Sequence, residues 1–163
     1  MVVRFQFTVQ GEEEAAQKLG KWATNLHNPA PAFDKMMDYL ATEQKDWFAT
    51  QGEGTWPQLS EPYRTWKRKR FPKRGILHGP DTKGHKGLQL RDQLTRRPFG
   101  IERIEGRSFT IGTNLPYADA HQQGEGNLPV RKPLKPLSPA MIRVMEDILK
   151  THIVGEVIER NLR

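Results

Sequence analysis

The stretch PAFDKMMDYLATEQKDWF, residues 31–48, sets the helical part of the fold. Proline is well tolerated at a first helical position, and the glycines at 52 and 54 mark the end of the helix. The apolar residues recur at helical spacing and form one stripe: Phe33, Met36, Met37, Leu40, Trp47 and Phe48. The stripe predicts a helix with one buried face.

A second amphipathic helix and a strand are expected before this stretch. Residues 12–14 are glutamates, which stabilise the first turn of a helix, and apolar residues follow at helical spacing up to Leu26. Asn28-Pro29 ends that helix. Residues 3–9 alternate between apolar and polar, which predicts a strand with four apolar residues on one face, ended by Gly11.

Short helices and one hairpin are expected in the middle of the chain. A helix over residues 61–69 would have Ser60 as its N-cap, and a shorter one is predicted around residues 88–94. Residues 99–104 and 108–112 flank Glu105-Gly106-Arg107, the pattern of a hairpin with a tight turn. Residues 116–123 are predicted to form a short helix or turn.

The end of the chain predicts an extended arm and a final helix. Residues 128–137 contain three prolines, which excludes a helix there. Ser138 is the predicted N-cap of the last helix, with Pro139 at its first position, and the helix is expected to continue past Gly155. Its predicted core face comprises Met141, Val144, Met145, Ile148 and Leu149.

These elements predict an α+β fold in one domain covering residues 1–163. A small antiparallel sheet would pack with N-terminal and C-terminal amphipathic helices, and a long basic loop would lie between them. The loop, at about residues 70–87, is expected to be mobile and to become ordered only on assembly. The arm at residues 128–137 is expected to be extended.

Composition narrows the class of protein. Only 36% of the residues are apolar, so a small core is expected, with part of the stability supplied by partner subunits. The absence of cysteine excludes disulfides, thiolate metal sites and a cysteine nucleophile. We see no signal peptide and no apolar run of membrane-spanning length, so a soluble protein without a standard export signal is expected.

The sequence offers little for catalysis. The five histidines, at 27, 78, 85, 121 and 152, form neither an HxH nor an HExxH pattern, and no GxSxG, phosphate-binding or dinucleotide-binding glycine motif is present. Asp34 and Asp38 share a helix face, as carboxylates do on most helices. We therefore expect no enzymatic activity, no cofactor and no metal, and a small hydrolase using His121 is a remote alternative.

Positive charge is concentrated in one segment. Residues 61–97 carry a net charge of +9, and the rest of the chain carries −2. Its densest run interleaves aromatic residues with cations that could neutralise phosphates: Arg64, Lys67, Arg68, Lys69, Arg70, Lys73 and Arg74. Trp66 or Phe71 could stack on a base. The alternative is a basic loop that faces solvent or an acidic protein, with these two aromatic residues buried as anchors.

Residues 111–124 carry a family resemblance. The segment IGTNLPYADAHQQG resembles the "GT-x-x-x-YA-x-x-HQ-x-G" signature of the phage virion morphogenesis, or tail completion, family of Mu-like and P2-like phages. The matching positions are Gly112, Thr113, Tyr117, Ala118, His121, Gln122 and Gly124. The family's basic, proline-bearing "R-P-x-L" segment is represented by Arg131 and Pro133 within residues 128–134, with an extra Lys132 between them.

The resemblance implies a structural virion protein that acts in tail completion or head–tail joining. It implies a homo-oligomeric ring, expected to be a hexamer, that contacts connector, terminator or tail proteins and surrounds the DNA that passes through the neck. The protein would reside in the neck or at the tail end of the virion, and in the host cytoplasm during assembly. The alternative is a basic accessory protein that binds DNA directly during morphogenesis.

The motif also has a mechanical interpretation. Tyr117 and His121 are four residues apart, so they share a face of a helical turn. We expect Tyr117 to pack and His121 to hydrogen-bond the backbone, which fixes the loop that leads to Arg131; a metal or catalytic role is the alternative. Gly124 and Gly126 are expected to adopt positive φ in the following turn.

Overall fold

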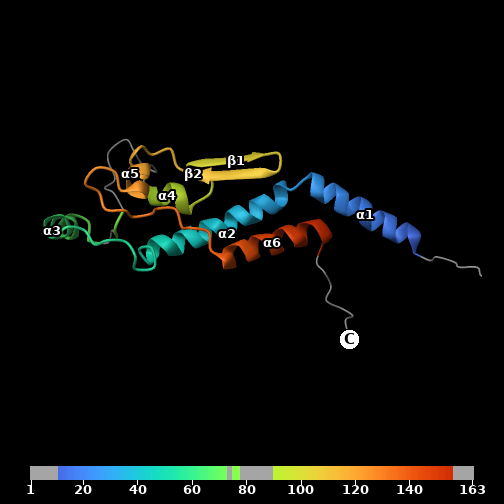
Figure 1. The fold of residues 1–163 in the computed structure, drawn as a ribbon, viewed down its shortest axis with the longest axis horizontal. Coiled ribbons are helices and arrows are strands. Elements are labelled where there is room, and N and C mark those ends of the chain that lie inside the picture. Colours follow the sequence, from blue (N-terminus) through green and yellow to red (C-terminus); the bar gives the residue numbers. More distant parts are fainter. Residues whose placement is uncertain (1–10, 73–74, 78–89, 156–163) are drawn as a thin grey trace, which may run out of the picture.

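The structure, a computed structural model, describes residues 11–72, 75–77 and 90–155 (Figure 1). Its elements confirm the predicted α+β fold. They are, in chain order, α1 (Glu12–His27), α2 (Ala30–Ala49), α3 (Glu61–Arg70), α4 (Leu90–Thr95), β1 (Ile101–Glu105), β2 (Ser108–Gly112), α5 (Tyr117–Gln123) and α6 (Pro139–Val154). The predicted strand at residues 3–9 and most of the predicted mobile loop at about 70–87 lie outside the described residues.

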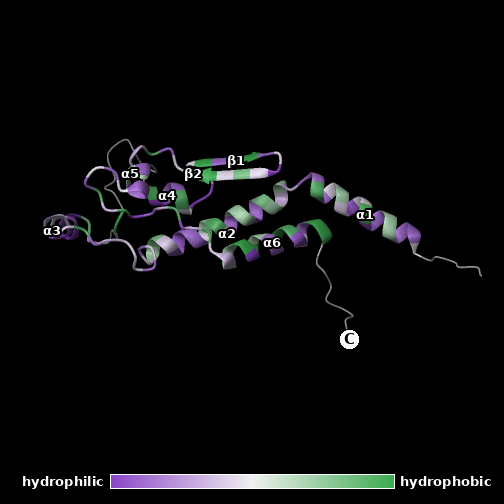
Figure 2. Cartoon of the chain, in the orientation of Figure 1, coloured by the Kyte–Doolittle hydropathy of each residue, from purple (hydrophilic) through white to green (hydrophobic). Residues whose placement is uncertain are grey.

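Helix α2 is the central element. It packs against α4 on one side and α6 on the other, and its Phe33 ring lies 5.3 Å from that of Phe109 in β2. Every residue of the predicted apolar stripe is buried. Figure 2 shows the alternation of hydrophobic and hydrophilic residues along α2 that produces this one-sided burial. Burial of each large apolar side chain contributes about 1.5–3 kcal/mol to folding.

An aromatic cluster closes the C-terminal end of α2. The ring of Trp56 lies edge-on to Trp47 at 6.3 Å and to Phe48 at 5.3 Å. The chain reverses direction through Gly52, whose φ is +68°. A Cβ at Gly52 would lie 2.5 Å from the Trp56 indole, so only glycine lets the indole pack against this turn.

The predicted hairpin is present, with its tight turn at Gly106. Ile101 pairs with Gly112 and Glu105 with Ser108, and Gly106 adopts the positive φ that the tight turn needs. Because β1 and β2 form a two-stranded sheet among the described residues, their stability depends on packing against α2 and on side-chain ties to it.

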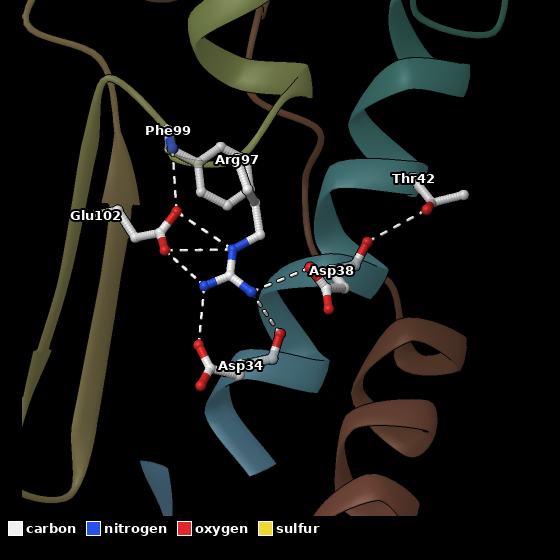
Figure 3. Close-up of polar contacts among 6 residues, drawn as sticks. All are labelled: Asp34, Asp38, Thr42, Arg97, Phe99 and Glu102. Carbon is white, nitrogen blue, oxygen red and sulfur yellow. Dashed lines mark hydrogen bonds and ion pairs between the residues drawn. The ribbon is translucent and has the colours of Figure 1, made fainter. Parts of the chain in front are cut away.

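Arg97 ties the hairpin to α2 (Figure 3). Its guanidinium lies 2.6 Å from Glu102 in β1, 2.9 Å from Asp34 and 3.0 Å from Asp38. The hydrogen bond from Arg97 holds the pKa of Glu102 below its usual range. Asp34 and Asp38 thus serve as ion-pair partners of Arg97 in this fold. The backbone N–H of Phe99 also donates to Glu102, at 3.0 Å.

The final helix has the predicted start but differs from its prediction at one core position. Ser138 caps it as expected by accepting a hydrogen bond from the Met141 N–H at 3.2 Å. Met141 is buried, but Val144 is 39% exposed, so its predicted core role is wrong: the contacts of α6 with α2 and with the C-terminal end of α1 leave this residue open to solvent. The helix ends at Val154, and Gly155 has a φ of +83°. Residues 157 and 158, where the helix is expected to continue, lie outside the described residues.

Helix α1 buries no residue of its own, although its predicted bounds are confirmed. It contacts the rest of the chain at its C-terminal end, where it meets the end of α6. In Figure 1 its first residue lies at the far end of the molecule from α3. Of the helices in the described residues, none combines the length and hydropathy that crossing a lipid bilayer requires.

Candidate functional site

The family-like motif forms a corner between the hairpin and α5. Gly112 is the last residue of β2, and the Thr113 hydroxyl donates to the Gln93 side chain of α4 and accepts from the Leu115 N–H. Ala118, the second residue of α5, is buried in the hydrophobic core. These contacts hold α5 against the centre of the molecule.

Glycine ends α5 as predicted. Gly124 has a φ of +77°, and a Cβ there would lie 2.6 Å from a methyl group of Val130. The close approach lets the arm return alongside α5, where the Gln122 side chain accepts the Leu134 N–H at 3.4 Å. Gly126 also adopts the predicted positive φ. The motif thus reverses the chain and starts the arm.

Tyr117 and His121 share a face of α5, as predicted, with ring centroids 6.3 Å apart. The prediction that the His121 ring hydrogen-bonds the backbone and fixes the following loop is wrong. The bond is made instead by the His121 carbonyl, which accepts the Arg131 N–H at 2.9 Å. The His121 Nδ1 is buried and has no hydrogen-bond partner among the described residues. Burial, together with the nearby Arg131 charge, lowers the pKa of His121, which favours the neutral ring.

Arg131 connects this corner to the segment that leads into α3. Its side chain is buried, and its Nε and Nη2 donate to the carbonyls of Pro57 and Gln58 at 2.8 and 3.0 Å. A planar guanidinium can satisfy two neighbouring carbonyls at once, which a lysine cannot do with the same geometry. Arg131 therefore fixes the entry to α3.

The arm that follows is fastened to α2 by side chains. The Trp47 and Trp56 indoles donate to the Lys132 carbonyl at 2.8 and 3.2 Å. Gln44 donates to the Pro133 carbonyl at 3.0 Å and accepts from the Lys135 N–H at 2.7 Å. The backbone of the extended arm is thus hydrogen-bonded without joining the sheet, and the side chain of Pro133 in the arm is fully buried.

A cavity of about 710 Å³ lies between α3, α5 and the start of the arm. Tyr63, Lys67, Tyr117, His121 and Arg131 are among the residues that line it. Its two cations are engaged with the backbone, since the Lys67 Nζ donates to the Gly75 carbonyl at 2.7 Å and Arg131 holds two carbonyls. No cluster of three or more potential metal ligands occurs within the ranges that the structure describes.

The basic residues of α3 divide into two groups. Arg68, Lys69 and Arg70 are exposed in its last turn, whereas the Lys67 side chain is buried. Arg64 is exposed and forms an ion pair with Glu61. Lys73 and Arg74 lie outside the described residues. The surface that α3 offers to a partner is therefore its last turn.

Aromatic residues flank that turn. Trp66 is 46% exposed and stacks on Tyr63, with centroids 5.4 Å apart and planes at 21°. Its other edge meets Phe71 at 5.8 Å. Trp66 is therefore not a buried anchor, and Tyr63 is equally exposed. Both residues belong to α3, which lies at one end of the molecule (Figure 1).

Two residues that position this site were not singled out from the sequence. Gln44 occupies a stripe position of α2, four residues after Leu40, and a polar residue on a buried face must be hydrogen-bonded. That irregularity could have identified it. Gln93, which holds Thr113 and whose carbonyl accepts the Gly100 N–H at 2.9 Å, had no comparable signal.

The geometry joins a hydrogen-bonded corner, a clamped arm and an exposed basic helix. Each motif residue in the corner contributes to packing or to backbone hydrogen bonds, or allows the chain to turn. No family model, curated protein or solved structure matches this chain.

Proposed function

We propose that this protein is a structural component of a tailed-phage particle that acts in tail completion or head–tail joining. The similarity of residues 111–124 and of Arg131 and Pro133 to the tail completion signature supports the phage assignment. The contacts of these residues fit a mechanical role. The corner fixes α5 against the core, and Arg131 fixes the entry to α3.

One observation carries the assembly part of the proposal, namely the uncovered apolar face of α1. Leu19 is 60% exposed and Leu26 is 54% exposed, and no residue of this 16-residue helix is buried. A contiguous apolar stripe left open on a long helix is typical of a protein–protein interface. Because α1 leads away from the core, it can reach a neighbouring subunit (Figure 1).

The proposed assembly is a closed ring. Contacts between two different faces of identical subunits generate a ring when the rotation between neighbours closes. The family resemblance favours a hexamer located at the neck or the tail end, in contact with connector, terminator or tail proteins. In this role the chain needs no cofactor.

The phage assignment is tested by removing the gene and imaging the particles by negative-stain electron microscopy. We expect heads and tails that fail to join, or tails that lack their end structure, and recovery when the intact gene is supplied. Normal, joined particles without the protein would contradict the proposal.

A matched pair of variants tests the role of α1 in the same particles. Leu19→Glu with Leu26→Glu places charge on the apolar face and is expected to block recovery, because a charge buried at an interface without a partner is strongly unfavourable. Gln17→Glu with Thr24→Glu adds the same charge to the opposite face and is expected to restore joining. Equal recovery by both pairs would exclude α1 as an interface.

The second candidate function is direct DNA binding by α3. The observation that favours it is the exposed group of Arg68, Lys69 and Arg70 beside the half-exposed Trp66. Cations of this kind neutralise phosphates and release counterions, and an exposed indole can stack on a base.

The DNA proposal is tested by gel retardation of a duplex over a range of salt concentrations. Charge reversal of Arg68, Lys69 and Arg70 to Glu should abolish retardation if α3 is the contact, and neutral glutamines there should lower the salt slope by about 3. The matched control reverses Lys18, Lys21 and Lys35, which changes the net charge equally elsewhere. Unchanged retardation by the α3 variant would exclude this surface.

A further inference from the structure

An apolar groove runs between β2 and α6 over the middle of α2. Its volume is about 540 Å³. Phe109 and Ile111 of β2 line one side, Ile142 and Met145 of α6 line the other, and Met36 lies on α2 between them. Ile142 is 42% exposed, so part of the groove is open to solvent.

The groove lies along an unpaired strand edge. Within the described residues β2 pairs with β1 alone, so its other edge has no strand partner. Along an antiparallel pair, residues alternate between pairs that hydrogen-bond each other and pairs whose N–H and C=O groups point outward. Glu105 and Ser108, which flank the two-residue turn, form a hydrogen-bonded pair, so Phe109 and Ile111 direct their N–H and C=O groups to the open edge.

The chain contains a segment with the sequence to fill this position. Val3, Phe5, Phe7 and Val9 alternate with polar residues, so a strand there would present four apolar side chains on one face. Three of these four side chains span about 13 Å along a strand. The α6 wall of the groove, from Met141 to Leu149, spans about 12 Å of helix, so the groove has the length to receive three of them.

The position of α1 places the start of this helix away from the groove of its own chain. Trp22 donates to the Val154 carbonyl, which places the contact with α6 ten residues after Glu12, or about 15 Å along α1. Val9 precedes Glu12 by three residues, which extend at most about 10 Å. Since α1 leads away from the hairpin (Figure 1), this placement favours a neighbouring copy as the acceptor of the segment.

We propose that residues 3–9 of one copy add as a third strand to the open edge of β2 in a second copy, with their apolar side chains in the groove. Strand addition of this kind supplies backbone hydrogen bonds from the edge and side-chain burial from the groove. The donor segment and the acceptor groove are different surfaces, so the contact is head to tail and can close a ring. The inference rests on the proposed self-assembly and is independent of its place in a phage particle.

Disulfide trapping in the full-length protein tests the contact, because the chain has no cysteine of its own. Gln6→Cys combined with Thr110→Cys places both thiols on the solvent face of the proposed neighbouring strands. Arg4→Cys and Thr8→Cys, each combined with Thr110→Cys, test the two adjacent strand registers. Mild oxidation should give a ladder of covalent oligomers on a non-reducing gel, lost on reduction. The control combines Gln6→Cys with Arg143→Cys, on the outer face of α6.

Two exposed residues of α6 provide a matched test of the groove. Ile142 lines it, whereas Val144 lies outside it, with 42% and 39% of their surface exposed. Ile142→Glu should weaken association at least about tenfold in sedimentation velocity, and Val144→Glu should leave it unchanged. Deleting residues 2–9 should weaken association as Ile142→Glu does.

The possible outcomes separate this inference from the proposed function. A chain that stays monomeric at every concentration overturns both. Oligomers that form without the specific cross-link, or that survive deletion of residues 2–9, overturn strand addition but not the proposed self-assembly. In that case α1 of a second copy is the remaining occupant of the groove. A cross-link confined to the monomer band shows that the segment binds its own chain and overturns the exchange.

Discussion

Helices α1 and α2 follow one another in the chain, and both carry an apolar stripe, yet their surroundings differ completely. Eight residues of α2 are buried, and none of α1 is. The stripe of α2 is covered by the hairpin, α4 and α6. Amphipathic spacing therefore shows that a helix face needs cover, but not whether the cover comes from the same chain.

The polar contacts of the two helices show the same contrast. Along α2, Asp34 and Asp38 hold Arg97, and Gln44 holds the arm. The long-range hydrogen bonds of α1 are confined to its last two turns: Trp22 donates to the Val154 carbonyl and Asn25 to that of His152. We infer that α2 organises the subunit and that α1 projects from it toward a partner.

The largest expected effect breaks the covered helix. Met37 is fully buried, so Met37→Asp would place an unpaired charge in the core and cost about 4 kcal/mol or more of unfolding free energy. That is a large fraction of the roughly 5–15 kcal/mol by which an ordinary domain is stable. Urea unfolding followed by circular dichroism measures the loss. Lys45→Asp, on the exposed face of α2, should leave the midpoint nearly unchanged; equal loss in both would show that α2 is not the core element.

The next largest loss of stability is expected at Arg131, which holds the corner to the segment that leads into α3. Arg131→Met keeps much of the buried side-chain volume but leaves the Pro57 and Gln58 carbonyls without their donor, at a cost of about 3 kcal/mol. Lys132→Met, at the exposed neighbouring position, is the control and should cost little. Thermal unfolding compares the two, and a stable Arg131→Met variant would contradict the clamp.

The ion-pair cluster on α2 predicts a smaller, pH-dependent effect. Arg97→Met should cost about 2 kcal/mol at neutral pH, whereas Arg96→Met, at an exposed neighbour, should cost almost nothing. Because the pKa of Glu102 is lowered in the folded state, its contribution is present above the ordinary glutamate pKa of about 4.3 and is lost as pH falls through the folded pKa.

The pH dependence is measured by urea unfolding from pH 7 down to pH 3. The wild type should lose stability more steeply than Arg97→Met as the pH falls below about 4.3. Parallel curves for the two proteins would show that Arg97 does not perturb Glu102.

The smallest effect concerns the uncovered helix. Leu19→Ala should change the unfolding free energy of the monomer by no more than about 0.5 kcal/mol, because Leu19 is exposed. The same change at the buried Leu40 should cost about 2–5 kcal/mol. Denaturation at low protein concentration measures both. A large loss at Leu19 would show that α1 is covered within its own subunit.

Much of the local structure could be predicted from spacing and turn chemistry. The bounds of α2, the tight turn at Gly106 and the Ser138 cap all follow from interactions between residues close in the chain. The error at Val144 has a different origin. Its helical position fits a core face, but the packing of α6 on α1 and α2 leaves the residue 39% exposed.

The candidate site was predictable only in part. The shared face of Tyr117 and His121 follows from helix geometry, and the exposed cations of α3 follow from composition. The burial of Lys67 and the two carbonyls held by Arg131 do not, because they join residues 8 and 73–74 positions apart. Such pairings depend on how the elements are folded together.

The sequence by itself determined the elements of this protein, their order and the concentration of charge between Glu61 and Arg97, because these depend on periodicity, turn residues and composition. The tertiary structure alone decided which apolar faces are covered, that Lys67 is withdrawn from the basic surface, and that the β2 edge and its groove are open. The physical reason is that burial depends on contacts between distant segments, and a periodic pattern does not specify its partner.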